Sequence, residues 1–261
     1  MKDWKANGNQ EQRLNVCRRQ WRPVKRTAQG AGPHSCGAVF TKMIPPQQGS
    51  RDLGRAASYI VTDLNQPMVD YAASRQPADT RIKWRQADAL ALPFENGAFD
   101  LVCCQFGAMF FPNRTSGYRE ARRVLKPGGH FLFNVWDRIE ENVFADVVTN
   151  ALAKIFPNDP PRFLARTPPG YHDTALIRSE LEDAGFSRVV IETRPEQSRA
   201  SSPRVPAVAY CQGTLLRNEI EARKAGELEA ATDYVASAIA DKHGRGEVAA
   251  KIQAHVIMAV V

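Results

Sequence analysis

The middle of the chain alternates between apolar runs and helix-like segments. Strand-like runs cover residues 59–63, 82–88 and 99–107, and a further one follows the Lys126-Pro127-Gly128-Gly129 stop, over residues 130–136. A helix is expected behind Asn65 as N-cap, starting near Pro67, and another over residues 113–125, with Arg119, Arg122 and Arg123 facing outward. Strands that alternate with helices in this way predict βαβ units and a parallel sheet.

The pattern continues with longer helices after residue 136. Asp173 is expected to cap a helix over residues 174–184, which Gly185 ends, and a strand follows over residues 187–193. Residues 195–246 are predicted to be mostly helical, with one apolar stripe of Leu228, Thr232, Val235 and Ile239. The apolar run over residues 252–261 predicts a buried last strand.

Two of the predicted strands end in a carboxylate. Asp63 closes the run over residues 59–63, and Asp88 closes the run over residues 82–88. Because open parallel sheets bind nucleoside ligands outside the carboxyl ends of their strands, these two aspartates predict a cofactor site at one edge of the sheet.

Residues 1–55 differ from the rest in charge and pattern. They hold 11 Lys/Arg and 3 Asp/Glu, whereas residues 56–261 hold 24 and 25, so the net charge of +7 comes from the first fifth of the chain. The segment lacks a clear period and is expected to be poorly structured. Its aromatic residues are few and it contains no known nucleic-acid module, which argues against nucleic acid as a partner.

Composition sets the remaining limits. A hydrophobic content of 43% and a charged content of 24% are typical of one globular domain of this length. No apolar run is long enough to span a membrane. The five cysteines show neither a C-x-x-C pair nor the spacing of metal ligands, so we expect a cytoplasmic protein without a metal site.

Four segments follow one another in the order of the motifs of a known family: Asp63 to Met68, Ala87 to Phe94, Phe99 to Val102 and Arg123 to Gly129. They resemble motifs of class I S-adenosylmethionine-dependent methyltransferases, and most closely those of small-molecule enzymes similar to ubiquinone/menaquinone C-methyltransferases. The resemblance implies a Rossmann-like, mostly parallel seven-stranded sheet with an antiparallel last strand and helices on both faces. The domain would cover residues 56–261, with residues 195–246 as a helical insertion.

The resemblance also implies roles for individual residues. Asp63 would accept hydrogen bonds from both ribose hydroxyls, and Asp88 from the exocyclic amine of adenine. Met68 would pack on the adenine face, and Gln105 would line the sulfonium and the substrate. With Leu64 beside Asp63 and a backbone contact from Ala89, these residues form the expected cofactor site. No catalytic base is assigned; His172, in a loop before a helix, is one candidate.

The chain departs from the family at its start. The family begins with an apolar strand and a Gly-x-Gly-x-Gly loop, yet upstream of Asp63 no convincing first strand or such loop is found. Gly37 is offered as a remnant of that loop. One hypothesis covers both observations: residues 1 to about 55 are an out-of-frame or rearranged translation joined to a genuine methyltransferase body.

The implied function is methyl transfer from S-adenosylmethionine to a small molecule, at a carbon or oxygen nucleophile. Two alternatives remain. A methyltransferase-like protein with an incomplete cofactor site is compatible with the missing loop. A dinucleotide-dependent oxidoreductase is disfavoured, because no G-x-G-x-x-G opens a helix.

Overall fold

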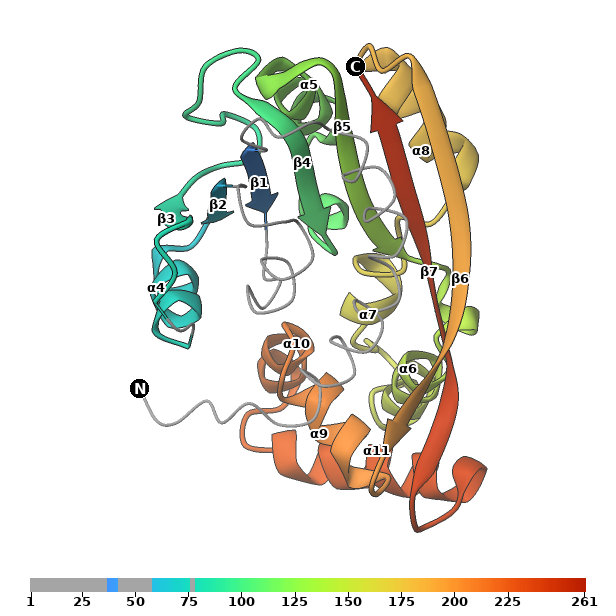
Figure 1. Cartoon of the computed structure of the whole chain (residues 1–261). Coiled ribbons are helices and arrows are strands. Elements are labelled where there is room, and N and C mark those ends of the chain that lie inside the picture. Colours follow the sequence, from blue (N-terminus) through green and yellow to red (C-terminus); the bar gives the residue numbers. More distant parts are fainter. Residues whose placement is uncertain (1–36, 42–57, 76–77) are drawn as a thin grey trace. The chain divides into compact units, whose positions relative to one another are not determined.

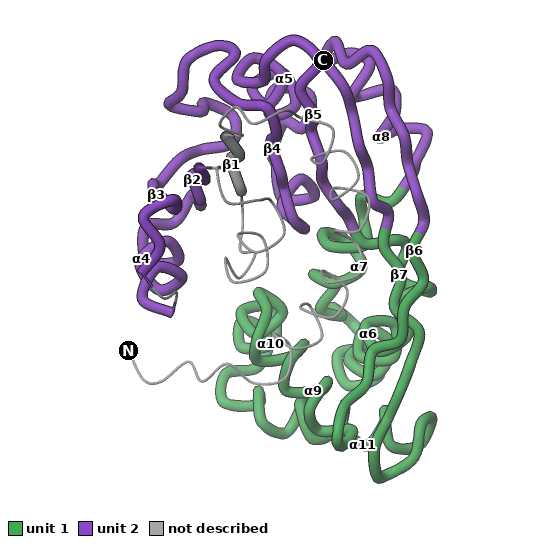
Figure 2. The backbone as a smooth tube through the Cα atoms, in the orientation of Figure 1, with its two compact units in different colours: residues 1–16, 136–172, 194–254 green, residues 17–135, 173–193, 255–261 purple. Residues whose placement is uncertain are grey.

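The computed structural model describes residues 37–41, 58–75 and 78–261 (Figure 1). These residues form two compact units (Figure 2). The helical unit contains residues 136–172 and 194–254. The sheet unit contains residues 173–193, residues 255–261 and the described residues before 136. The chain therefore passes between the two units more than once.

The strands follow the order β3-β2-β1-β4-β5-β7-β6. The pairs β3–β2, β2–β1, β1–β4 and β4–β5 are all parallel. This confirms the predicted α/β fold, with parallel strands connected through helices. The strands are β1 (Gly37–Thr41), β2 (Ser58–Asp63), β3 (Ile82–Gln86), β4 (Phe99–Gln105), β5 (Leu125–Trp136), β6 (Arg188–Ala200) and β7 (Val248–Val260).

A first strand is present although the sequence does not predict it convincingly. β1 has only five residues and lies between β2 and β4, where Val39 is opposite both Ile60 and Val102. Hydrogen bonding to a neighbour on each side stabilises a short strand that has no strong apolar period of its own. Tertiary pairing, which a reading of local pattern cannot detect, therefore decides this element.

Three α-helices of the sheet unit begin close to their predicted starts: α4 (Gln66–Ser74), α5 (Arg114–Val124) and α8 (Thr174–Asp183). Asp173 caps α8 by accepting from the backbone N–H groups of Ala175 and Leu176. Gly185, at φ 91°, ends it, and Phe186 N donates to Leu181 O at 3.1 Å, as in a Schellman motif. Asn65 precedes α4, but its side chain makes no capping hydrogen bond, so that part of the prediction was wrong.

An aromatic cluster packs at the centre of the sheet unit. Tyr118 of α5 lies 5.7 Å from Phe131 and 5.3 Å from Phe133, measured between ring centroids. Phe131 stacks on Phe186 at 5.8 Å. All four side chains are buried. Burial of apolar surface on this scale is the main stabilising contribution to such a core.

Three strands are longer than predicted, among them β7, which begins at Val248 rather than at residue 252. β5 begins at Leu125, opposite Phe99, and its register then shifts so that Leu101 is opposite His130. The Lys126-Pro127-Gly128-Gly129 segment is thus an irregularity inside the strand rather than a stop before it, with Gly128 at φ 74°. β6 continues to Ala200, past the predicted end at residue 193.

The helical unit has its own apolar core. The predicted stripe of the last helix is confirmed, because Thr232, Val235 and Ile239 are buried on α11. Val235 and Ile239 belong to one core cluster with buried side chains of the other helices, among them Phe144, Leu152 and Leu216. No helix in the described part of the chain is long and apolar enough to cross a membrane. The helices are α6 (Val143–Ile155), α7 (Phe163–Arg166), α9 (Arg204–Cys211), α10 (Leu216–Arg223) and α11 (Leu228–His243).

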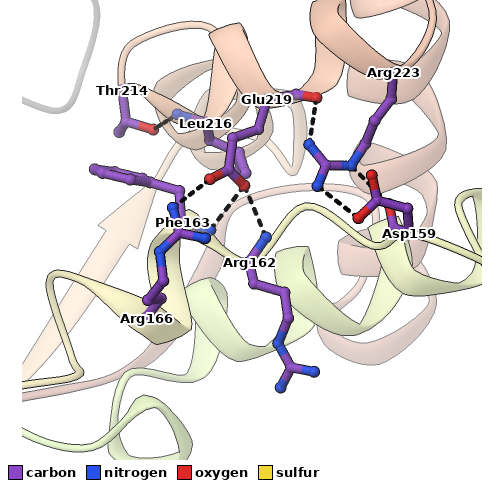
Figure 3. Close-up of polar contacts among 8 residues, drawn as sticks. All are labelled: Asp159, Arg162, Phe163, Arg166, Thr214, Leu216, Glu219 and Arg223. Carbon is purple, nitrogen blue, oxygen red and sulfur yellow. Dashed lines mark hydrogen bonds and ion pairs between the residues drawn. The ribbon is translucent and has the colours of Figure 1, made fainter.

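Glu219 of α10 joins that helix to α7 within the helical unit (Figure 3). One carboxylate oxygen accepts from the backbone N–H groups of Arg162 (2.8 Å) and Phe163 (3.0 Å). The other accepts from the Arg166 guanidinium at 2.6 Å. Glu219 therefore satisfies N–H groups that the first turn of α7 would otherwise leave without partners.

Candidate cofactor site

The carboxyl ends of β2 and β3 are tied together by their backbones. Asp63 is opposite Gln86 in the parallel register, and Ala87 N donates to Asp63 O at 3.0 Å. The Gln86 side-chain amide also donates to Leu64 O at 2.9 Å. Asp63 and the residues that follow Gln86 consequently lie at the same edge of the sheet, as the sequence predicts.

Each of the two aspartates has one oxygen engaged locally. Asp63 Oδ1 accepts from Asn65 N, and Asp88 Oδ1 accepts from Leu90 N, both at 2.9 Å. Within the described part of the chain, the Oδ2 atom of neither carboxylate has a hydrogen-bond partner. The local bonds orient each carboxylate and leave its second oxygen able to accept from a ligand.

Apolar side chains accompany Asp63. Leu64 is 60% exposed, which is high for a leucine, and Met68 is half-buried in the first turn of α4. α4 begins three residues after Asp63 and packs against β2 and β3, so its first turn, which contains Met68, follows the end of β2 directly. Ala89 follows Asp88 directly and is half-buried. Two carboxylate acceptors accompanied by apolar side chains suit a ligand that has a flat ring and hydrogen-bond donors at more than one position.

Gln105 ends β4, which is on the other side of β1 from β2. It is buried and lies opposite Asn134 of β5. Since all of these strands are parallel, Gln105 is at the same edge of the sheet as Asp63 and Asp88. The structure thus brings five of the predicted residues together at β2, β3 and α4 and places Gln105 further along that edge.

Gly37 is at the opposite edge. It is the first residue of β1 and is opposite Ser58, the first residue of β2, whereas the predicted site lies at the last residues of these strands. The expectation that Gly37 belongs to a loop is therefore corrected: it is part of a strand. The segment that follows β1 at the site's edge, residues 42–57, is outside the described residues.

The residue after Gln105 has a strained backbone. Phe106 has φ 47°, in the left-handed region that bulky side chains rarely adopt. Its N–H donates to both acceptors of Asn134, to the side-chain Oδ1 at 2.8 Å and to the backbone O at 3.2 Å. Strain of this kind persists only where surrounding contacts enforce it, and it is concentrated at functional sites.

Asn134 was missed by sequence reasoning as a candidate residue. It interrupts the apolar run Phe131 to Val135, but the run alone does not show which residue lies opposite it. Its role becomes visible only when the register places it opposite Gln105. A polar residue inside an apolar strand, opposite another polar residue at a sheet edge, is the signal that would have found it.

The candidate base His172 lies in the helical unit. Its Nδ1 is 2.7 Å from Pro169 O, and a carbonyl can only accept, so Nδ1 carries the proton. Nε2 then holds the lone pair, which is the tautomer that a general base requires. No group of three or more metal-ligating side chains is found among the described residues.

Comparison with known proteins agrees with this geometry. The family model of the methyltransferase domain matches residues 44–133. The ubiquinone/menaquinone biosynthesis C-methyltransferase UbiE of Marinomonas sp. is 27% identical over 151 residues, which are 53% of this chain and 60% of that protein. The demethylmenaquinone methyltransferase of Lactobacillus johnsonii is 27% identical over 155 residues, 54% of this chain and 63% of that protein. The chain thus matches less than two thirds of the length of these relatives.

Solved structures establish the fold. The YcgJ protein of Bacillus subtilis has a TM-score of 0.56 at 15% identity, covering 96% of this chain and 98% of that one. Phosphoethanolamine N-methyltransferase 2 of Haemonchus contortus, solved with phosphomonomethylethanolamine and S-adenosylhomocysteine, has a TM-score of 0.56 at 16% identity, covering 99% of this chain and 55% of that one. Residues 44–133 thus match the family model of a methyltransferase domain, and the chain shares its fold with these solved structures.

Proposed function

We propose that this protein transfers a methyl group from S-adenosylmethionine to a small-molecule acceptor, at a carbon or oxygen nucleophile. The observation that carries the proposal is the pair of carboxylates at the ends of β2 and β3, each with one oxygen left to accept from a ligand. The names of the two relatives, both methyltransferases of quinone biosynthesis and one of them a C-methyltransferase, favour carbon.

Different residues of the site would contact different parts of the cofactor. Asp63 would accept from the two ribose hydroxyls, because an ionised carboxylate is an acceptor only and suits a diol. Asp88 would accept from the adenine amine, with Ala89 as a backbone contact. Leu64 and Met68 would pack against the adenine ring, and they shield it from water.

Gln105 and the strained Phe106 would lie on the side of the acceptor. When bound, S-adenosylmethionine supplies an electrophilic methyl carbon on a positively charged sulfur. The contribution of the protein is then to align the acceptor with that carbon and to exclude water. A base is needed only if the nucleophile must lose a proton, and no residue is assigned that role.

The proposal also covers the strand arrangement of the sheet, the domain boundaries and the cellular compartment. The strand order supports a seven-stranded sheet whose last strand, β7, runs antiparallel, as in the family. The division of residues 56–261 into a methyltransferase domain with an insertion at 195–246 stays a prediction. A cytoplasmic location likewise stays a prediction, made from the cysteine pattern of the sequence.

Calorimetric titration with S-adenosylhomocysteine tests the cofactor site. We expect micromolar binding by the wild type and a loss of about 10- to 100-fold in Asp63→Asn, because charged hydrogen bonds contribute roughly 1.5–3 kcal/mol. Asparagine can still accept from Asn65 N, so this variant removes the charge and the second acceptor while keeping the local turn.

Asp70→Asn is the matched control. Asp70 is an exposed aspartate of α4 that accepts from the Gln66 side chain, and its substitution should leave the affinity unchanged. A folded wild type that does not bind S-adenosylhomocysteine would contradict the proposal and favour the alternative, a methyltransferase-like protein with an incomplete cofactor site.

A further inference from the structure

The segment Asp88–Gly97, here called the adenine-side loop, is held by the side chain of Arg123 on α5. Arg123 Nη1 donates to Phe94 O and to Asn96 Oδ1, each at 2.8 Å. Its Nη2 donates to Leu92 O, also at 2.8 Å. The outward orientation predicted for Arg123 was therefore wrong, since its guanidinium lies across this loop.

Glu120, one turn earlier on α5, completes the arrangement. Its Oε1 accepts from Arg123 Nε at 2.7 Å, and its Oε2 accepts from Arg123 Nη2 and from Leu92 N, each at 2.8 Å. Both backbone polar groups of Leu92 are thus bonded to the Glu120–Arg123 pair. At the far end of the loop, Gly97 N donates to Arg123 O at 3.0 Å.

Glu120 and Arg123 form an ion pair that is partly shielded from solvent. Its side chains are 20% (Glu120) and 32% (Arg123) exposed. The hydrogen bond from Arg123 lowers the pKa of Glu120, helped by Leu92 N against the opposing effect of burial, and Glu120 in turn raises the pKa of Arg123. Both groups stay ionised around neutral pH, so the two parallel N–H···O bonds of a bidentate pair persist there.

Most other bonds of the loop are internal or weaker. Ala91 N donates to Asp88 O, and Phe94 N donates to Leu92 O. Arg85 reaches Pro93 O at 3.2 Å, and the ring of Phe94 packs edge-on against Phe99 at 5.1 Å. The Glu120–Arg123 pair therefore makes the largest set of short polar contacts between this loop and the rest of the sheet unit.

We propose that Glu120 and Arg123 are positioning residues that hold the adenine-side loop so that Asp88 selects a purine with an exocyclic amine over one with a carbonyl at the same position. The proposal rests on the function proposed above. A fixed carboxylate attracts an amine donor and repels a carbonyl oxygen, because two acceptors then face each other. A loop able to move away would relieve that repulsion, and the discrimination would fall.

The test compares two ligands, S-adenosylhomocysteine and S-inosylhomocysteine; in the second a carbonyl replaces the exocyclic amine and the neighbouring ring nitrogen N1 carries a proton. We expect the wild type to prefer the adenosyl ligand by about 100-fold or more. In Arg123→Lys, which keeps the charge but loses the planar fork, and in Glu120→Gln, the ratio of the two dissociation constants should fall at least about tenfold.

Arg122→Lys is the matched control, because Arg122 directly precedes Arg123 in α5 and donates to Gly185 O rather than to the loop. Its ratio should equal that of the wild type. A merely structural role for Arg123 would weaken both ligands alike and leave the ratio unchanged.

Melting temperatures show whether each variant is folded. An unchanged ratio in folded Arg123→Lys and Glu120→Gln, with tight adenosyl binding by the wild type, overturns this inference alone. Failure of the wild type to bind either ligand overturns the proposed function, and this inference with it.

Discussion

The two units of the chain are ordered by different kinds of contact. In the sheet unit, backbone pairing and side chains bonded to backbone groups position the candidate site: Gln86 on Leu64 O, Asn134 on Phe106 N, and Arg123 on the adenine-side loop. In the helical unit, buried aliphatic and aromatic side chains of α6, α9 and α11 form one core, and Glu219 links α7 to α10.

This difference in contacts should decide how many side-chain substitutions each unit tolerates. Hydrogen-bond geometry tolerates little displacement, whereas an apolar core accepts many substitutions that conserve volume. We therefore expect the sheet unit to conserve the geometry of a cofactor site and the helical unit to tolerate changes in side chain. Substitutions of equal chemistry in the two units test this comparison.

The largest effect is expected from truncating one core leucine in each unit. Leu152 of α6 and Leu181 of α8 are both fully buried. Replacing either by alanine should lower the free energy of unfolding by about 2–5 kcal/mol, through lost burial and the cavity left behind. Hydrogen exchange should show faster exchange in α6, α9 and α11 for Leu152→Ala, and in α5 and α8 for Leu181→Ala.

Leu176→Ala is the control on α8, since this side chain is 44% exposed and should change stability by about 0.5 kcal/mol or less. If both core variants accelerated exchange equally over the whole described chain, the two units would unfold as one cooperative body, and the comparison between them would fail.

Features that depend on local pattern could be predicted from the sequence. Asp63 ends β2 and Asp88 lies two residues after β3, so parallel pairing alone brings them to one edge. Asp173 and Gly185 bound α8 as expected, because a cap and a left-handed glycine act within a few residues. For the same reason the α11 stripe was found from its helical spacing.

Features that depend on tertiary contacts could not be predicted from the sequence. β1 is stabilised by two neighbours, and five residues carry too weak a pattern to show it. Arg123 has the sequence environment of a solvent-facing helix residue, and only the fold brings backbone acceptors of the adenine-side loop to its guanidinium. Asn134 likewise needs the β4–β5 register.

A smaller effect, dependent on pH, is expected at Glu219. Burial by itself raises the pKa of this carboxyl, but hydrogen bonds from Arg166 and from Arg162 N and Phe163 N outweigh it and lower the pKa. A carboxyl with a lowered pKa contributes stability that is complete above its unfolded pKa of about 4.3 and is lost as the pH falls through the folded value.

Glu219→Gln should therefore lower the free energy of unfolding at pH 7 by about 1–2 kcal/mol, and the difference from the wild type should shrink below about pH 4. Urea unfolding at pH 7, 5, 4 and 3 measures it. Glu221→Gln, an exposed position on the same helix, is the control and should show little effect at any pH. A difference that stays constant down to pH 3 would mean that the link to α7 does not need the charge.

The smallest expected change in stability comes from replacing two glycines that have room for a side chain but differ in backbone conformation. Gly97, at the end of the adenine-side loop, has φ 64°, and a Cβ added there would meet no atom within 4 Å. Gly246 of the helical unit is equally open, but its φ is outside the left-handed region. Gly97→Ala should lower the free energy of unfolding by about 1 kcal/mol, the cost of a left-handed residue that carries a Cβ.

Gly246→Ala should be neutral or stabilising by about 0.4–1 kcal/mol, because alanine restricts the unfolded chain without strain in the folded one. Gly97→Asn should recover part of the loss, since asparagine tolerates the left-handed region. Urea unfolding curves of the three variants measure these differences. Equal losses in Gly97→Ala and Gly246→Ala would show that the backbone geometry of the adenine-side loop is no more demanding than a turn of the helical unit. The contrast between a unit positioned by its backbone and one positioned by packing would then not extend to this loop.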